Sequence, residues 1–190
     1  MAEQKTTCSS CGREIRLVTA ERRHGMCVPC HRNAAKPLEE LLADQVFERI
    51  DAVIGPATDP KAAVQDLQAL PPGYALCYAF QHVHAEILNG GISQLYSNSA
   101  WSLILQAEEA ARQAGVSRVS NLLREIVFYY HQRNRSKHKR SLAEDYFASL
   151  PSNWDKSLKQ LDDDFFCMEQ DANSVILRLC CDNQELFTDA

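Results

Sequence analysis

Apolar residues recur at steps of three and four residues from position 38 onward, the spacing that places them on one face of an α-helix. Pro37 suits the first position of such a helix, because a helix start leaves that backbone N–H unpaired in any case. The Gly55-Pro56 pair ends the pattern. The sequence therefore predicts an amphipathic helix from about residue 37, with apolar positions Leu38, Leu41, Leu42, Phe47, Ile50, Val53 and Ile54.

Further helical segments follow along the rest of the chain. Asp59 before Pro60 is typical of a helix N-cap and first turn, and Ser99 is typical of another N-cap. The Asn-Gly-Gly sequence at 89–91 and the glycine Gly115 are each typical of a helix end. No alternating strand pattern appears after the N-terminal segment, so we expect an all-α, bundle-like body. The predicted helices span 59–70, 74–88, 99–114, 117–130, 141–149, 153–170 and 172–181, with a helical turn or loop at 92–98.

Four cysteines near the N-terminus form two CxxC pairs. Cys8 and Cys11 make the first pair, and Cys27 and Cys30 make the second, after a spacer of fifteen residues. A two-residue gap lets both thiolates of a tight turn reach one metal ion at ~2.3 Å, and a second such turn completes a tetrahedron. This is the spacing of zinc ribbons. We predict one structural Zn²⁺ bound by all four cysteines in a small ribbon or knuckle module at 1–36, with a short hairpin in the spacer.

Two other uses of the CxxC pairs fit less well. Disulfides are disfavoured because the sequence shows no export signal. A redox pair normally begins a helix in a βαβ unit, whereas here two pairs share one short, arginine-rich segment. A zinc site closed by four thiolates has no open coordination position, which argues for a scaffold rather than for catalysis. The other four cysteines, which lie among apolar residues and are expected to be ordinary buried thiols, are Cys77, Cys167, Cys180 and Cys181.

The net charge of −5 divides into blocks of opposite sign. Residues 1–36 carry +4, whereas residues 37–190 carry −9. The basic run 133–140, and the arginines within 13–32, could contact phosphates or an acidic partner. Residues 141–190 carry −8, and carboxylates fixed on a helical scaffold can bind the basic surface of a DNA-binding protein. The residues expected to bind such a partner are Asp162, Asp163, Asp164, Glu169 and Asp171.

The sequence lacks the motifs of the common enzyme classes. It has no GxSxG, Walker, GxGxxG or HExxH motif. His82 and His84 lie two residues apart, so on a helix they face different directions and cannot bind one metal ion together. The sequence also has no run of eighteen apolar residues and no apolar N-terminal leader. We therefore expect a non-enzymatic, cytoplasmic protein that does not enter a membrane.

The segment NGGISQLYSN (89–98) resembles the NGG-F-x-Q-Y-F-x-N signature of a bacterial family of all-helical domains, whose best-known members are acidic DNA-mimic proteins. The segment LKQLDDDFF (158–166) is similar to the L-D-x-x-F-F ending of that family. Ile92 and Leu95 stand where the signature has phenylalanine and tyrosine. The resemblance extends over roughly residues 38–187, and its signature positions are Asn89, Gly90, Gly91, Gln94, Tyr96 and Asn98.

This resemblance implies an all-α fold with no known catalytic activity and a surface that engages a transcriptional regulator in place of DNA. With the cysteine module at 1–36 and a DNA-mimic-like domain at 37–190, we expect a zinc-containing protein-interaction module with a basic protein partner. Two alternatives stay open. One is a nucleic-acid-associated adaptor that uses the zinc module and the basic run. The other is an immunity or antitoxin-type protein. Each of the three is compatible with a homodimer.

Overall fold

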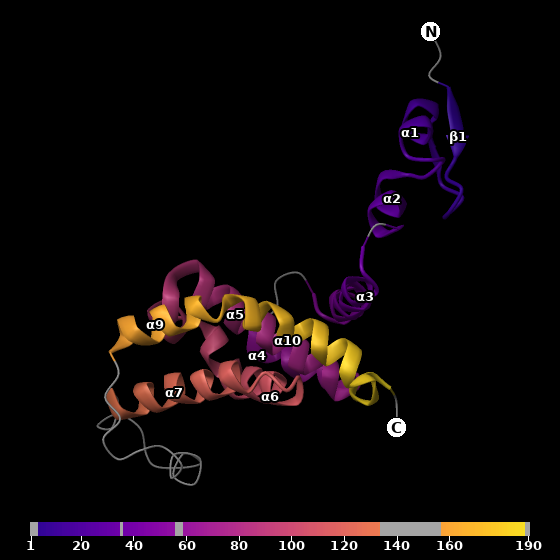
Figure 1. Cartoon of the computed structure of the whole chain (residues 1–190). Helices are drawn as coiled ribbons and strands as arrows, with labels where there is room; N and C mark the ends of the chain where they lie inside the picture. The colour runs from indigo at the N-terminus through magenta and orange to yellow at the C-terminus, as the bar shows by residue number, and fades with distance from the viewer. Residues whose placement is uncertain (1–3, 35, 56–58, 134–156, 189–190) are drawn as a thin grey trace. The chain divides into compact units, whose positions relative to one another are not determined.

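The structure is a computed structural model, and it divides the chain into two compact units, Met1–Leu41 and Leu42–Ala190 (Figure 1). The predicted helix at 141–149 and the basic run beyond Arg133 lie outside the described residues. The residues that the structure describes are 4–34, 36–55, 59–133 and 157–188.

A β-hairpin and two short helices make up the N-terminal unit. Strand β1 (Lys5–Thr7) pairs antiparallel with strand β2 (Glu14–Arg16). Helix α1 (Leu17–Arg22) follows β2 directly, and helix α2 is Val28–Ala34. The hairpin therefore encloses the first cysteine pair. The prediction of a hairpin within the spacer is wrong, because the segment after β2 is rich in helix-forming side chains and continues as a helix.

The second unit is built from helices, which confirms the predicted all-α class. The first four residues of helix α3 (Leu38–Val53) belong to the first unit, and the rest belong to the second. No helix within the described ranges combines the length and the apolar character that a membrane span requires. The other α-helices are α4 (Pro60–Asp66), α5 (Pro72–Ser97), α6 (Ile104–Gln113), α7 (Ser117–Arg133), α9 (Leu158–Cys167) and α10 (Glu169–Asp182). The 3₁₀ helices are η1 (Leu67–Ala69), η2 (Ser99–Leu103) and η3 (Gln184–Phe187).

Local capping residues set several of these helix ends. The Asp59 side chain accepts hydrogen bonds from two backbone N–H groups in the first turn of α4, as its N-cap position predicts. Gly115 has φ +69° and ends α6 in a Schellman motif, in which the N–H of Val116 donates to the carbonyl of Ala111 at 2.9 Å. Ser99 is the first residue of η2 and not the N-cap of α6, so that prediction is wrong.

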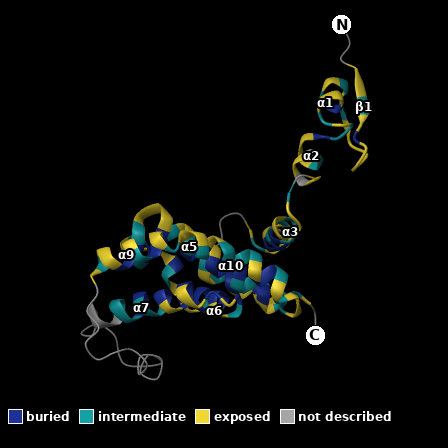
Figure 2. Cartoon of the chain, in the orientation of Figure 1, coloured by how far each residue is buried: buried dark blue, intermediate teal, exposed yellow. Residues whose placement is uncertain are grey.

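Helix α5 forms the centre of the hydrophobic core. It packs against η2, α6, α9 and α10, and the buried residues lie where these helices face one another (Figure 2). Two helices from the end of the sequence therefore close a core that begins at Ala43 on α3. The large side chains of this core that are less than 2% exposed include Phe80, Ile87, Ile92, Leu103, Leu123, Leu161, Phe165 and Leu179.

A kink divides α5 where the sequence predicted its end. Gly90 and Gly91 have non-helical backbone angles, but the chain resumes its helix and continues to Ser97. Gly91 has φ +74° and ψ −176°, a region that is essentially restricted to glycine. The N–H of Ile92, freed by the kink, donates to Oδ1 of Asp162 on α9 at 2.8 Å. Of the helical turn or loop predicted at 92–98, the helical form is confirmed over 92–97 and the loop form is wrong, because this distant carboxylate caps the second half of the helix.

Helices α6 and α7 are joined by a buried polar group. Glu108 on α6 is 4% exposed. Its Oε1 accepts hydrogen bonds from the Ser120 hydroxyl at 2.7 Å and from Nε of Arg124 at 2.9 Å, both on α7. A buried carboxylate is tolerated when it is paired and hydrogen-bonded in this way. The arrangement therefore satisfies a charge inside an otherwise apolar helix pair.

Candidate metal centre and charged surfaces

The four N-terminal cysteines come together in one cluster. The Sγ atoms of Cys8, Cys11, Cys27 and Cys30 all lie within 4.8 Å of one another. The Sγ atoms of Cys11 and Cys27, which belong to different CxxC pairs, are 3.9 Å apart. Four sulfurs each ~2.3 Å from one zinc ion would be ~3.8 Å from each other, the edge of a regular tetrahedron. The cluster therefore has the size of a four-thiolate metal site.

Backbone geometry in two short segments positions these sulfurs. Cys8 and Cys11 lie in the turn between β1 and β2, where Gly12 takes φ +70°. Cys27 directly precedes α2, and Cys30 lies in the first turn of that helix. The N–H of Cys27 donates to Sγ of Cys8 at 3.2 Å, which joins the two segments. The second pair thus begins a helix, which differs from the two hairpins of a zinc ribbon.

Hydrogen bonds shift the pKa values of two thiols of the cluster in opposite directions. Backbone N–H groups of Cys27 and Cys11 lower the pKa of the Cys8 thiol to about 6, because they stabilise the thiolate. The hydrogen bond to Cys27 raises the pKa of Cys30 to about 12. These hydrogen bonds thus favour the thiolate at Cys8 and the neutral thiol at Cys30. The donor set fits a soft-to-borderline metal such as zinc.

Three of the residues predicted to bind a partner make interactions within the chain. Asp162 uses Oδ1 to cap the second half of α5, as described above. Asp163 pairs with Lys159 at 2.6 Å, and Asp171 pairs with Arg118 of α7 at 2.9 Å. Consecutive residues on a helix differ in direction by ~100°, so Asp162, Asp163 and Asp164 face different sides of α9. Asp164 is half-buried and Glu169 is exposed.

Two of the signature residues, Gln94 and Asn98, bind the same carboxylate at the half-exposed side of α5. Oε2 of Glu86 accepts hydrogen bonds from Nε2 of Gln94 at 2.8 Å and from Nδ2 of Asn98 at 2.5 Å. The Tyr96 hydroxyl donates to the backbone carbonyl of Ile126 on α7 at 2.9 Å. Asn89 is exposed on α5, next to the glycine kink. These residues hold the two halves of α5 together and fix α5 to α7, so the signature specifies the fold.

Comparison with known proteins finds a family that shares the region around this kinked helix. The family model described as DMP19-like protein matches residues 68–183. This range includes the whole of α5, its kink and the Asp162 cap. The chain belongs to the DMP19-like protein family. No curated protein and no solved structure matches it.

The N-terminal third of the chain lies outside the region that the DMP19-like family model matches. The cysteine cluster and α3 precede residue 68, so family membership accounts for the kinked helical body alone. Sequence analysis identified the four cysteines from their spacing but gave no role to Glu86. That residue lies eight positions before Gln94 and twelve before Asn98, which would be ~12 and ~18 Å along a straight helix. The contacts form only because the chain bends at the two glycines, and local sequence rules do not predict that bend's direction.

Sequence analysis also missed a row of carboxylates on α3. Asp44, Glu48 and Asp51 are spaced by four and three residues, so they lie on one face of the helix. The buried residues of α3, Val46 and Ile50 among them, lie on another face. The heptad-like spacing was visible in the sequence, but the three consecutive aspartates of α9 were the stronger signal of charge. Negative charge thus lies along α3, before the DMP19-like region, as well as near the C-terminus.

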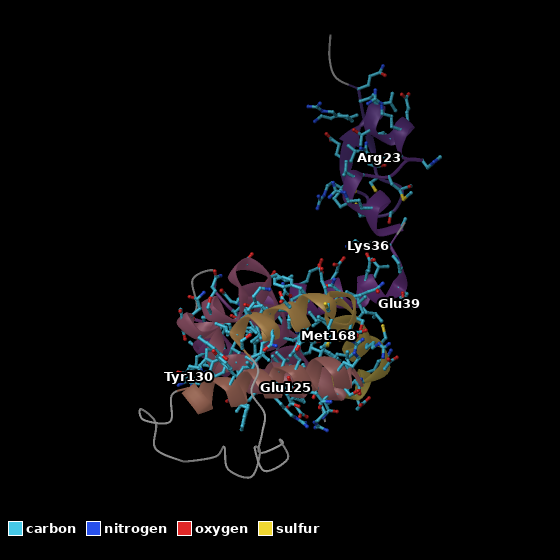
Figure 3. The ribbon with its side chains drawn as sticks, turned by 60° about the vertical axis from the view of Figure 1, so that its left-hand side comes forward. Arg23, Lys36, Glu39, Glu125, Tyr130 and Met168 are labelled. Carbon is cyan, nitrogen blue, oxygen red and sulfur yellow. The ribbon has the colours of Figure 1, made fainter. Side chains whose placement is uncertain are left out.

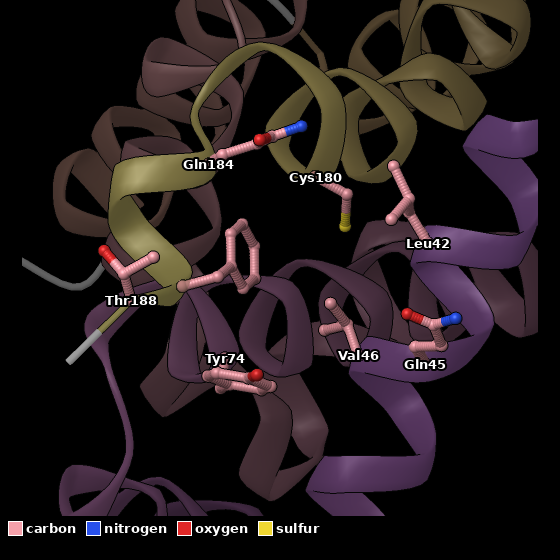
Figure 4. A pocket seen from close by; sticks show the side chains of 8 residues that line it. Leu42, Gln45, Val46, Tyr74, Cys180, Gln184 and Thr188 are labelled. Atoms are coloured by element: carbon pink, nitrogen blue, oxygen red, sulfur yellow. The ribbon is translucent and has the colours of Figure 1, made fainter.

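A pocket of about 280 Å³ lies between α3, α5 and η3 (Figure 4). Leu42, Val46, Tyr74 and Phe187 line it, and the Cys180 thiol faces it. No charged side chain is among its lining residues. It is smaller than the ~300–1,000 Å³ of ordinary ligand sites. We therefore interpret it as loose packing beside α3.

His84 should make the DMP19-like body less stable at mildly acidic pH. Its ring lies between Phe80 and Phe165, and its Nε2 is buried without a hydrogen-bond partner among the described residues. Burial lowers the pKa of His84 below its ordinary value of 6.5, and the nearby Glu169 offsets this effect only in part. The folded state thus binds fewer protons than the unfolded state. The free energy of unfolding should fall as the pH drops below about 6.5, and His84→Gln should reduce this dependence. Urea titrations of both proteins across this range test it, and an unchanged pH dependence in the variant would contradict the assignment.

Proposed function

We propose that this protein is a non-enzymatic interaction module whose acidic helical body binds a basic protein partner. The observation that carries the proposal is the charge of the body. Residues 42–133 and 157–188 contain sixteen Asp and Glu against eight Lys and Arg, a net charge of −8. Four of these eight basic residues form ion pairs with carboxylates of the body. The carboxylates of the body therefore outnumber those that its ion pairs neutralise. The paired basic residues are Arg112, Arg118, Arg124 and Lys159.

The carboxylates of α3 supply a regular part of this surface. Asp44, Glu48 and Asp51 extend over ~10.5 Å of helix axis, or one charge per ~5 Å. One strand of DNA carries a phosphate charge every ~3.4 Å along the duplex axis. The row therefore has roughly two-thirds of the axial charge density of a single strand, which is sufficient to attract a phosphate-binding surface.

A DNA-binding protein is the partner class that this proposal favours. Its basic surface is built to meet rows of fixed negative charge. The resemblance of the signature segment to acidic DNA-mimic proteins supports the same class. In this proposal the cysteine cluster holds one structural Zn²⁺, with Cys8, Cys11, Cys27 and Cys30 as its ligands. The metal orders the N-terminal unit and takes no part in a reaction.

Affinity capture with the full-length protein tests the proposal. The bait carries Arg13→Ala and Arg22→Ala, so that the basic N-terminal unit does not itself contribute DNA binding. We expect captured proteins to be basic, and to be released by duplex DNA and by salt. Glu48→Gln with Asp51→Asn should weaken capture several-fold, because two of the three carboxylates of the α3 row are lost.

Arg49→Gln is the matched control on the same helix. It removes a basic residue beside the carboxylate row, so capture should be unchanged or stronger. Captured proteins that are neutral or acidic, or that duplex DNA fails to release, would contradict the proposal. Equal loss of capture in the Arg49 and carboxylate variants would contradict the assignment to α3.

A further inference from the structure

The segment that carries the cysteines has a charge opposite to that of the body. Residues 4–36 contain seven Lys and Arg against two Glu, a net charge of +5. Four thiolates around one divalent metal ion contribute about −2, so this segment with the metal keeps a net charge of about +3. The rest of the unit Met1–Leu41 adds Glu3, Glu39 and Glu40, so the positive charge is concentrated in residues 4–36. Lys5 and Glu14 form an ion pair across the hairpin, which leaves the arginines as the main source of the excess.

The arginines are attached to the segments that carry the cysteines. Arg13 lies in the hairpin turn two residues after Cys11, and its carbonyl accepts a hydrogen bond from the N–H of Cys8 at 2.8 Å. Arg22 ends α1, and Arg23 is the residue that caps it. Arg13 and Arg22 are exposed, and Arg23 is half-exposed.

These two segments are held against each other. The N–H of Ser9, in the hairpin turn, donates to the carbonyl of Gly25 at 2.9 Å. A Cβ atom at Gly25 would approach Oγ of Ser9 to 3.3 Å, so the two backbones are in close contact. The arginines that flank them are therefore presented from one small, cross-linked unit. Side chains that end in nitrogen extend from it around Arg23 (Figure 3).

We propose that this basic unit binds the phosphate backbone of double-stranded nucleic acid without sequence preference. Guanidinium groups form paired hydrogen bonds to phosphate oxygens, and their charge releases counterions from the duplex. Residues 1–36 contain no Phe, Tyr or Trp on which unpaired bases could stack. Single-strand binding depends on such aromatic platforms, so the chemistry favours a duplex. The described part of the body, residues 42–133 and 157–188, has a net charge of −8 and disfavours contact with the same duplex.

Fluorescence anisotropy tests the proposal. The zinc-loaded, full-length protein is titrated into a labelled duplex of about 20 base pairs, at salt concentrations between about 50 and 200 mM. Two or three phosphate contacts predict that log K falls with log salt with a slope of about −2 to −3. Arg13→Ala with Arg22→Ala should reduce the magnitude of this slope by about 2. Removal of the metal with a chelator should weaken binding as strongly, because it releases the two segments from each other. DNA and RNA duplexes should bind alike.

Arg178→Ala is the matched control, since it removes an exposed arginine from α10 and should leave the slope unchanged. The metal content of the arginine variants is measured as a control, and one metal ion per chain would show that their N-terminal unit is folded. No binding at low salt, tighter binding to a single strand, or an equal effect of Arg178→Ala would overturn the proposal. Loss of concentration-dependent self-association in the arginine variant, without any duplex binding, would also overturn it and identify the acidic body of a second copy as the partner. The carboxylate variants of α3 do not enter this experiment, so it can fail while the proposed function stands.

Discussion

Cys27→Ser is expected to abolish stoichiometric metal binding and to unfold the N-terminal unit. Within residues 4–34 the buried side chains are Cys8, Ala20 and Cys27, so two of the three are proposed metal ligands. A unit with so little apolar burial cannot offset the entropy of ordering its chain. Binding of structural zinc supplies an apparent ~10–16 kcal/mol in small modules of this kind. Loss of the metal therefore removes most of the free energy that folds the unit.

Metal analysis of the purified protein and amide hydrogen exchange measure the two effects. The wild type should contain one zinc ion per chain, and residues 4–34 should lose protection in Cys27→Ser while the body keeps it. Cys167→Ser, which changes an exposed cysteine of α9, is the matched control and should behave as wild type. Full zinc content in Cys27→Ser, or protection of residues 4–34 without any metal, would contradict the assignment.

Gly91→Ala is expected to destabilise the helical body by about 3 kcal/mol. Two costs combine at this position. A side chain at φ +74° and ψ −176° is strained by about 1–3 kcal/mol. Its Cβ would also lie 2.9 Å from Oδ1 of Asp162, the oxygen that accepts the Ile92 N–H. The carboxylate must move, and the cap on the second half of α5 is lost with it.

Urea unfolding of the two proteins measures this difference. Gly115→Ala separates the two costs, because Gly115 has φ +69° and no atom within 4 Å of a Cβ built there. It should cost only the backbone strain, about 1 kcal/mol. Equal losses at the two glycines would mean that the contact with Asp162 contributes nothing. No measurable loss in Gly91→Ala would show that the kink is not required.

Interactions between residues close in sequence were predictable for this chain. Asp59 and Gly115 act as the expected helix N-cap and helix end, because a cap depends on a few neighbouring residues. The clustering of Cys8, Cys11, Cys27 and Cys30 followed from their spacing for the same reason. Each CxxC pair forms within one turn, and short backbone contacts, such as that from the Cys27 N–H to Cys8, join the two.

The differences from prediction occur where a distant residue decides the local structure. The glycines at 90 and 91 interrupt the helix as local rules predict, and the helical segment after them is capped by Asp162, seventy residues after Ile92. An aspartate run gives no sign of which carboxylate accepts a hydrogen bond from a distant segment, so this cap was not predictable. The segment after β2 was predicted as part of a hairpin because two CxxC turns suggested two similar halves.

The buried Glu108 has a consequence for how the body reaches a single structure. Ala107, Ala110, Ala111 and Ala114 are buried along the same stretch of chain, and such small side chains let two helices slide past each other at little cost. The carboxylate between them tolerates one alignment, in which Ser120 and Arg124 reach it together. Any shift by a turn strands a charge in an apolar layer at a cost of several kcal/mol. We infer that Glu108 fixes the alignment of α6 against α7, at some cost in the free energy of folding.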